Sequence, residues 1–299
     1  MGEDTRLKSL TKLTIPDLIK HQAKNFSSKP ALISDDETLT FSDLDKLSTN
    51  IASHIINLGI LPGDRVAIWA PNMNEWVLAG IAIHKAGGVL VPINTRMKGK
   101  EAAYILNNAG AKILFSVKTF LGTNYFKLLE NEELPHLQHQ ISLDENHLSD
   151  QIKSIGSIKE HASEAKFPEI NESDMADIIF TSGTTGKPKG VMSTHVQNIK
   201  VFDYWSSYIG LNEKDQYLIV NPFFHTFGYK AGWLASIMRG ATAYPCPVFD
   251  ADKIIEIINK EKISMLPGPP TLYQSILTSN LIETMDISSL RLGVTGAAS

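Results

Sequence analysis

The chain has 299 residues, of which 43% are hydrophobic and 20% are charged, as in folded globular proteins and unlike disordered or fibrous chains. Its 28 Lys and Arg against 32 Asp and Glu give a net charge of -4, and no basic block is present to neutralise phosphates, so nucleic acid is not an expected partner. The single cysteine, Cys246, excludes an internal disulfide and a cysteine-based zinc site, which fits a reducing compartment.

The N-terminal residues carry no uninterrupted apolar core of the kind that a secretion signal requires. The longest apolar stretch, Val77 to Pro92, contains His84 and Lys85 and is shorter than a membrane span. The sequence therefore predicts a cytoplasmic protein with no membrane span.

The first part of the chain repeats one pattern, in which a short apolar strand precedes a helix-length segment that ends at glycine. We predict strands over 39–41, 65–69, 89–93 and 113–116, and helices over 42–58, 74–86 and 98–108. Ser42 and Asp45 are expected to cap the first of these helices, and Gly59 to end it. Apolar strands separated by helices predict a parallel sheet covered on both faces.

The pattern weakens from about residue 118 to 173 into a charged, helix-prone region, which we interpret as a variable surface connection. It resumes with strands predicted over 177–180, 216–220, 241–245, 263–266 and 290–295. We therefore predict an α/β protein with two mostly parallel sheets packed with helices. Its expected division is one α/β subdomain over residues 1–175 and a second over 176–299.

The segment from Thr181 to Val191 carries the clearest chemical signal. It reads Thr-Ser-Gly-Thr-Thr-Gly-Lys-Pro-Lys-Gly-Val and follows a predicted strand. Glycines let a backbone approach an anion closely, hydroxyl and N–H groups donate to its oxygens, and two lysines add positive charge. The segment departs from the Walker A pattern, because only two residues separate its glycines and Pro188 follows the first lysine. Taken alone, it allows either a polyphosphate site, with ATP as the candidate, or a flexible glycine-rich surface loop.

Together with Thr194 and His195, this segment resembles the signature of the AMP-forming adenylating superfamily, which includes acyl-CoA synthetases and aryl-CoA ligases. Further similar segments extend the resemblance over nearly the whole chain: LTFSDL (39–44), GDRVAIWAPN (63–72), KAGGVLVPIN (85–94), NPFFHTFG (221–228) and GAA (296–298). The stretch from Phe223 to Leu277 is most similar to CoA ligases of fatty-acid type, including those that activate the indane-propanoate fragment of degraded steroid rings. The fold implied is the large N-terminal domain of that superfamily, incomplete at its C-terminus.

The resemblance implies an acid–thiol ligase that uses ATP, Mg²⁺ and CoA. A hydrophobic carboxylate attacks the α-phosphorus of ATP, pyrophosphate leaves, and the CoA thiol then displaces AMP from the acyl-adenylate. The residues implied to bind the ATP phosphates are Thr181, Ser182, Gly183, Thr184, Thr185, Gly186, Lys187 and Lys189. Among them, Thr184, Lys187 and Lys189 are assigned to charge stabilisation in catalysis, and the Thr181 hydroxyl to a contact with Mg²⁺.

Two other segments receive roles from the same resemblance. Gly296, Ala297 and Ala298 match a segment whose backbone lies along the adenine and the acyl pocket, where small residues suit a flat ring. His225 matches a position that lines the acyl site, where it would orient the carboxylate or gate the channel. The alternative for His225 is a histidine held by hydrogen bonds within an aromatic core.

Several elements of the superfamily find no match in residues 1–299. They are the Tyr-Gly-x-Thr-Glu element, the aspartate that binds ribose, the hinge, and the small C-terminal domain with its adenylation lysine. We therefore expect this chain to be a fragment of a longer protein and to have little or no activity by itself. Two alternatives to a CoA ligase stay open: an adenylating enzyme with another acyl acceptor, and a non-catalytic ATP-binding remnant.

Overall fold

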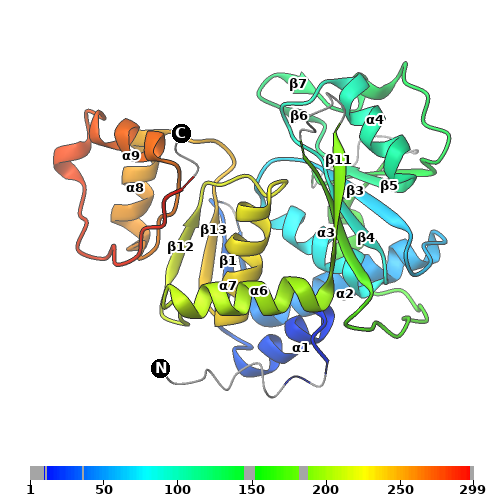
Figure 1. Ribbon diagram of the computed structural model, residues 1–299, viewed down its shortest axis with the longest axis horizontal. Coiled ribbons are helices and arrows are strands. Elements are labelled where there is room, and N and C mark those ends of the chain that lie inside the picture. Colours follow the sequence, from blue (N-terminus) through cyan, green and yellow to red (C-terminus); the bar gives the residue numbers. More distant parts are fainter. Residues whose placement is uncertain (1–9, 11, 36, 145–151, 182–187, 297–299) are drawn as a thin grey trace.

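The protein is an α/β structure in which helices pack against two large sheets (Figure 1). The computed structural model describes residues 10, 12–35, 37–144, 152–181 and 188–296. All but two of the neighbouring strand pairs in the two large sheets are parallel, because helices or longer connections join most of their strands. The predicted fold class is therefore confirmed.

The larger sheet has seven strands in the order β11-β10-β4-β3-β5-β8-β9. Its strands are β3 (Arg65–Trp69), β4 (Val89–Pro92), β5 (Ala111–Ser116), β8 (His139–Ser142), β9 (Lys153–Ser154), β10 (Met175–Thr181) and β11 (Lys189–Thr194). The antiparallel β10–β11 hairpin forms one end of this sheet. The strands predicted near residues 65, 89, 113 and 177 are confirmed, with bounds that shift by no more than two residues.

The second sheet has four strands in the order β12-β13-β1-β2. They are β1 (Pro30–Ile33), β2 (Thr38–Thr40), β12 (Gln216–Ile219) and β13 (Thr242–Pro245). The segments predicted as strands over 263–266 and 290–295 each contribute one parallel bridge beyond β12, from Tyr217 to Met265 and from Met265 to Leu292. They therefore continue the sheet only as single bridges, which corrects the prediction of two full strands.

Both sheets combine strands from the two sides of residue 175. β10 pairs with β4 in the larger sheet, and β1 pairs with β13 in the smaller one. The division expected at residue 175 therefore does not coincide with a division between sheets.

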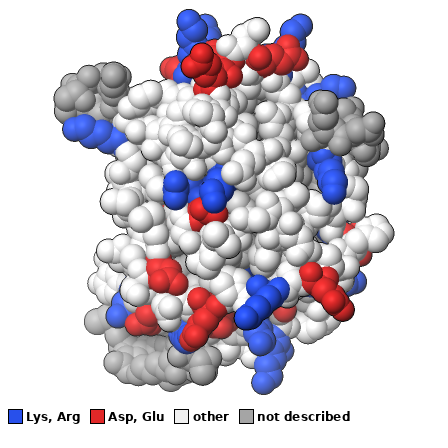
Figure 2. Space-filling view, turned by 90° about the vertical axis from the view of Figure 1, so that its right-hand side faces the viewer, with Lys and Arg blue, Asp and Glu red and all other residues white. Residues whose placement is uncertain are grey.

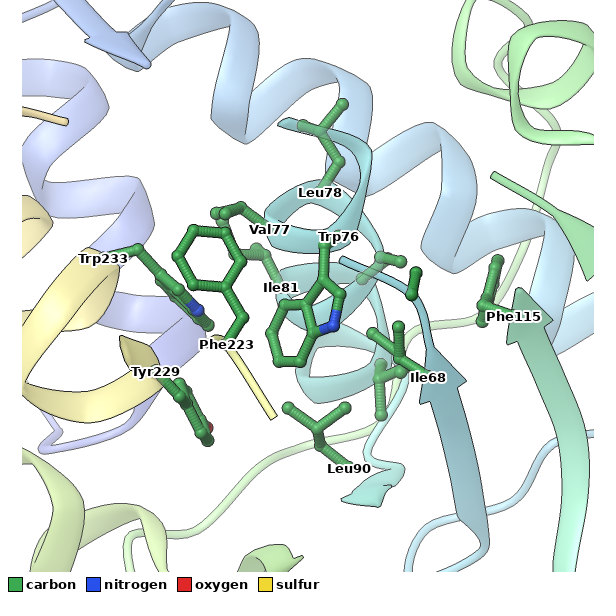
Figure 3. Packing of buried hydrophobic residues seen from close by; sticks show 14 of the residues in the cluster. Ile68, Trp76, Val77, Leu78, Ile81, Leu90, Phe115, Phe223, Tyr229 and Trp233 are labelled. Carbon is green, nitrogen blue, oxygen red and sulfur yellow. The ribbon is translucent and has the colours of Figure 1, made fainter. Parts of the chain in front are cut away.

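Helix α3 (Asn74–Lys85) lies at the centre of the molecule, and Glu75 is its one residue that is not buried. Between its polar ends, residues 76–83 are apolar on every side, as expected for a helix enclosed by other elements. Trp76 contacts an aromatic cluster from the second half of the chain, with ring centroids 5.5 Å from Phe223 and 6.2 Å from Trp233 (Figure 3). Tyr229 stacks on Trp233 at 4.9 Å. One core thus joins both halves of the chain.

The remaining elements surround this core. The other helices are α1 (Ile15–Asn25), α2 (Phe41–Asn57), α4 (Gly99–Ala109), α5 (Ile155–Lys159), α6 (His195–Tyr208), α7 (Ala235–Arg239), α8 (Ala251–Glu261) and α9 (Pro270–Leu277). The short elements are β6 (Thr119–Phe120), β7 (Thr123–Asn124), η2 (Lys127–Leu129), η4 (Ile282–Thr284) and the π-helix η3 (Phe227–Leu234). Within the described ranges, no helix is both long enough and apolar enough to cross a membrane.

Two local predictions need correction. Helix α2 is capped by Thr40 and Asp43, not by Ser42 and Asp45, because Thr40 accepts from the Asp43 N–H at 3.1 Å and the Asp43 carboxylate accepts from the Thr40 N–H at 2.9 Å. The region from 118 to 173 is not mainly helical, since β8 and β9 extend the larger sheet and α5 has only five residues. Buried Ile141 and Leu143 anchor β8, so tertiary packing overrides the local helical preference.

Charged side chains of both signs are interspersed on the face that Figure 2 shows, mainly near its upper and lower margins. Uncharged side chains cover much of the middle of that face. Among the described residues of this face, no broad area of a single sign of charge is visible, in keeping with the small net charge of the sequence.

Candidate active site

The β10–β11 hairpin positions the two described ends of the predicted phosphate segment. Thr181 is the last residue of β10 and Lys189 is the first of β11, and their Cα atoms are register partners. Both residues are exposed, at the point where β10 ends and β11 begins. Strand β11, which was not predicted, separates this segment from helix α6.

Most of the predicted phosphate segment lies outside the described residues. This applies to Ser182, Gly183, Thr184, Thr185, Gly186 and Lys187, and also to Ala297 and Ala298 in the predicted adenine segment. Their assignments stay predictions.

His225 lies in a turn that follows β12, at an edge of the smaller sheet. Its N–H donates to the Pro222 carbonyl at 3.0 Å, and its side chain is exposed. The alternative of a histidine enclosed by an aromatic core therefore does not describe this position. The His225 side chain is exposed, although Phe223, two residues earlier, is fully buried.

Asn72 fixes this turn from the other sheet. It follows β3 and is 4% exposed. Its Nδ2 donates to the carbonyls of Ile219 at 3.1 Å and Asn221 at 3.0 Å, and its Oδ1 accepts from the Phe223 N–H at 2.7 Å. Three hydrogen bonds from one buried amide thus set where the segment carrying His225 leaves the sheet.

Gly296 follows the segment that bridges the smaller sheet at Leu292. Two residues before it, the Val294 carbonyl accepts from the Gly268 N–H at 3.0 Å. A Cβ built on Gly296 would meet no described atom within 4 Å. The described contacts therefore do not by themselves require a glycine here, and the proposed close approach of adenine stays a prediction.

A cavity of about 930 Å³ lies where strands of both sheets end. Its wall includes residues that follow β3, β4, β12 and β13, among them Asn72, Thr95, Phe224 and Phe249. Met97, Phe120, Tyr125, Val220 and Leu272 make much of its surface apolar, and Arg96 and Lys98 add positive charge. Such a space accommodates a small molecule with an apolar body and an anionic group.

A buried ion pair lies behind the hairpin. Lys230 Nζ, on η3, is 2.8 Å from Asp177 Oδ1, on β10, and the two side chains are 6% and 0% exposed. Lys230 Nζ also donates to Ser193 Oγ on β11 at 3.0 Å, and Asn198 Nδ2 donates to Asp177 Oδ2 at 2.5 Å. Burial raises the pKa of Asp177, while Lys230 and the hydrogen bonds from Asn198 and Ser193 act in the opposite direction.

Two buried histidines lie close to this pair. The rings of His84 and His195 meet at 5.2 Å, and His84 Nε2 shares a hydrogen bond of 2.9 Å with the Tyr229 hydroxyl. His195 Nδ1 accepts from the Ile15 N–H at 3.4 Å. Burial lowers the pKa of His195 to about 4 and that of His84 well below its usual range. Both rings are therefore neutral near pH 7, and His195 helps to hold α1 against α6.

The low pKa of His195 predicts acid sensitivity. An unfolded histidine binds its proton near pH 6.5, whereas folded His195 does so only near pH 4, so stability falls as the pH falls through this window. We expect His195 alone to account for a loss of about 3 kcal/mol of unfolding free energy between pH 7 and pH 4. Urea unfolding of the wild type and of His195→Gln at pH 7, 5.5 and 4.5 measures this.

The variant should lose stability less steeply with acid than the wild type. The comparison separates His195 from its neighbours, because His84, whose pKa burial also lowers, and Asp177, whose raised pKa has the opposite effect on stability, are present in both proteins. Parallel pH profiles for the two proteins would contradict the prediction.

The chain belongs to the AMP-binding enzyme family, whose model matches residues 19–299. The resemblance drawn from the sequence is therefore confirmed at the level of the family.

Among its relatives is a 3-[(3aS,4S,7aS)-7a-methyl-1,5-dioxo-octahydro-1H-inden-4-yl]propanoyl:CoA ligase of Mycobacterium tuberculosis, which is 40% identical over 95% of this chain and 57% of the relative. A mitochondrial medium-chain acyl-CoA ligase of Homo sapiens is 30% identical over 96% of this chain and 51% of the relative. The chain thus spans somewhat more than half the length of the curated relatives that it matches.

Solved structures agree with this membership. The inhibitor-bound N-terminal domain of FACL13 from Mycobacterium tuberculosis has a TM-score of 0.85 and 26% identity, over 95% of this chain and 70% of that domain. An anthranilate CoA ligase solved with anthranoyl-AMP has a TM-score of 0.88 and 25% identity, over 95% of this chain and 55% of that one.

Proposed function

We propose that the protein encoded with this chain activates a hydrophobic carboxylic acid with ATP through an acyl-adenylate and then transfers the acyl group to CoA. One observation carries the proposal: the exposed ends of the β10–β11 hairpin and the turn with His225 lie at edges of two sheets, and a largely apolar cavity begins at that turn. Membership in the AMP-binding family and the acyl-CoA ligase relatives support the same chemistry.

In the first step, negative charge accumulates on the departing pyrophosphate. Lys189 presents a positive charge beside Thr181, whose hydroxyl donates or accepts at the same edge, and Thr184 and Lys187 are proposed to complete this set. Fixed donors of this kind stabilise the transition state because they need no reorientation when the charge develops. The two lysines serve as charges and not as proton carriers.

Mg²⁺ would bind together with ATP at the end of the β10–β11 hairpin. Within the described ranges, no three His, Cys, Asp or Glu side chains gather into a metal site. We propose the Thr181 hydroxyl as the protein contact of Mg²⁺, which would otherwise be held by phosphate oxygens and water. Bound there, Mg²⁺ would neutralise charge on the phosphates.

The cavity at the His225 turn is the proposed place for the acid. A second cavity, of about 1000 Å³, lies beyond Asn72, but its wall contains no residue between Asn221 and Gly228, and several of its lining side chains are charged, such as Lys159, Glu160 and Glu256. The smaller, more apolar cavity includes Phe224 next to His225. An apolar acid with its carboxylate toward His225 therefore fits the smaller cavity better.

The test is ATP–pyrophosphate exchange with the protein as the gene encodes it, using medium-chain, aryl and fused-ring propanoate acids, followed by thioester formation with CoA. We expect exchange that depends on the acid, and a CoA thioester as product. Exchange without a thioester would show that another acceptor is used, and ATP binding without exchange would show a non-catalytic protein. Residues 1–299 assayed alone are expected to exchange little.

His225 is expected to influence the choice of acid more than the binding of ATP. His225 is exposed in the turn whose residues Asn221, Pro222 and Phe224 line the cavity, so removal of its imidazole changes the polarity that we propose the carboxylate meets, while the hairpin stays intact. We expect His225→Ala to change relative kcat/KM values among the acids by about 10-fold and the KM for ATP by less than about 3-fold. An unchanged acid profile would remove His225 from the site.

A further inference from the structure

Lys230 occupies an unusual position for a charged residue. It lies within an otherwise apolar helical segment, η3, where both neighbours, Tyr229 and Ala231, are buried. A lysine enclosed in this way is stable only when its charge is paired and its hydrogen bonds are made. The partners of Lys230 therefore show which other elements η3 has to contact.

Those partners belong to both strands of one hairpin. Asp177 on β10 and Ser193 on β11 are register partners, and Lys230 Nζ contacts each of them, at 2.8 Å and 3.0 Å. Asn198 on α6 holds the second oxygen of Asp177 at 2.5 Å. One side chain from η3 thus ties together the two strands and, through Asp177, helix α6.

The same elements carry the proposed reactive groups. Asp177 and Ser193 lie on the strands that end at Thr181 and begin at Lys189, each four residues along its strand from the proposed phosphate edge. Lys230 lies just beyond His225, and the first bond of this helical segment runs from the Tyr229 N–H to the His225 carbonyl at 3.0 Å. The contact therefore bridges the part of the chain that would bind the acid and the part that would bind ATP.

We propose that Lys230 is a positioning residue for adenylation, because it fixes the His225 segment relative to the hairpin that ends at Thr181 and Lys189. This inference rests on the proposed function. Bringing a carboxylate to the α-phosphorus requires the two binding segments to keep a set separation, and a misplacement of about 1 Å can cost about 100-fold in rate. The ion pair supplies that constraint from beneath the site, without touching either substrate.

The chain offers a matched control pair. Lys85 on α3 is also buried, and its Nζ contacts Asp45 Oδ1 at 2.7 Å and Thr49 Oγ1 at 2.8 Å. Lys85 thus contacts an aspartate and a hydroxyl, as Lys230 does, but its partners lie on α2. Removing this second pair also takes away one buried lysine charge and one aspartate charge, here on the more exposed Asp45, and does not touch the hairpin.

The experiment compares Lys230→Met/Asp177→Asn with Lys85→Met/Asp45→Asn in the protein as the gene encodes it. Each double variant removes both charges, so neither leaves one charge buried alone. Exchange kinetics and thermal unfolding are measured for both. For the Lys230 variant we expect kcat of ATP–pyrophosphate exchange to fall about 10- to 100-fold, with KM for ATP and acid changed less than about 3-fold. The control variant should keep the kcat of the wild type.

Unchanged kcat in the Lys230 variant, or an equal loss in both variants, overturns the proposal. If the Lys230 variant does not fold, Ser193→Ala provides a milder change that removes one contact of Lys230 and should lower kcat about 3-fold, while wild-type kcat in Ser193→Ala overturns the proposal.

Hydrogen exchange separates failure of this inference from failure of the proposed function. In the Lys230 variant, amides of Phe227–Leu234 and of the β10–β11 hairpin should exchange faster, and amides of α2 should not. If the wild type shows no pyrophosphate exchange, adenylation is rejected, and so is the positioning role of Lys230. Faster hydrogen exchange in the Lys230 variant would then still show that Lys230 holds η3 to the hairpin. Unchanged hydrogen exchange in the Lys230 variant shows that Lys230 does not hold η3 to the hairpin, whatever the activity.

Discussion

Lys187→Ala is expected to lower the rate of acid-dependent pyrophosphate exchange by roughly one to three orders of magnitude. The substitution removes a positive charge from the segment framed by Thr181 and Lys189, where charge develops on the leaving group. Since that charge is largest in the transition state, kcat should fall more than the affinity for ATP. Steady-state exchange kinetics with saturating acid measure both quantities, and Thr184→Ala is expected to change them in the same direction.

A suitable control is Lys200→Ala, because Lys200 is an exposed lysine on α6, several residues beyond the hairpin. This control loses the same unit of charge and should keep the exchange rate of the wild type. If Lys187→Ala and Thr184→Ala both exchanged pyrophosphate at the wild-type rate, the assignment of the segment to ATP phosphates would be wrong.

Trp76→Ala should produce the largest loss of stability, about 3–5 kcal/mol of unfolding free energy. Trp76 is fully buried, and its ring meets Phe223, Tyr229 and Trp233, which come from the other half of the chain (Figure 3). Truncation would leave a cavity that α3, enclosed on nearly every side, cannot collapse to fill. Urea unfolding monitored by circular dichroism measures the change.

Tyr204→Ala serves as the control for the loss of a large aromatic residue. Tyr204 is 72% exposed on α6, so its removal should change the unfolding free energy by no more than about 0.5 kcal/mol. Trp76→Phe should cost clearly less than Trp76→Ala, since the indole N–H has no hydrogen-bond partner among the described residues. A loss below about 1 kcal/mol for Trp76→Ala would contradict the central place given to this ring.

Much of the fold follows from hydrophobic patterning. The strands near residues 65, 89 and 216 and helix α3 were predictable because apolar runs of the right length lie between turn residues. The cap of α2 was misplaced by two residues, since Thr40, Ser42, Asp43 and Asp45 satisfy the capping pattern almost equally well. Strands β8 and β9 were missed because β8 pairs with β5 and β9 pairs with β8, and the local sequence of neither strand indicates its partner.

The site was only partly predictable. The roles of Thr181, Lys189 and His225 were predicted through the resemblance and stay predictions, whereas the buried contacts that hold their segments were not predicted. Asp177 in an apolar strand and Lys230 in an apolar helix were both visible as isolated charges in the sequence, and pairing them would have been a reasonable hypothesis. The role of Asn72 was harder to foresee, because it depends on which turn of the other sheet lies opposite.

Each sheet combines strands from both halves of the chain, and this has a consequence for folding during synthesis. Thr242 Oγ1 on β13 donates to the carbonyl of Pro30, 212 residues earlier. During synthesis, β1 and β2 therefore leave the ribosome long before β13, the other strand that pairs with β1, exists. The early hairpin must stay soluble without its sheet, and pairing over such separations is slow and exposes the chain to aggregation. For this protein, the time at which residue 245 is translated sets the earliest moment at which either half can acquire its native core.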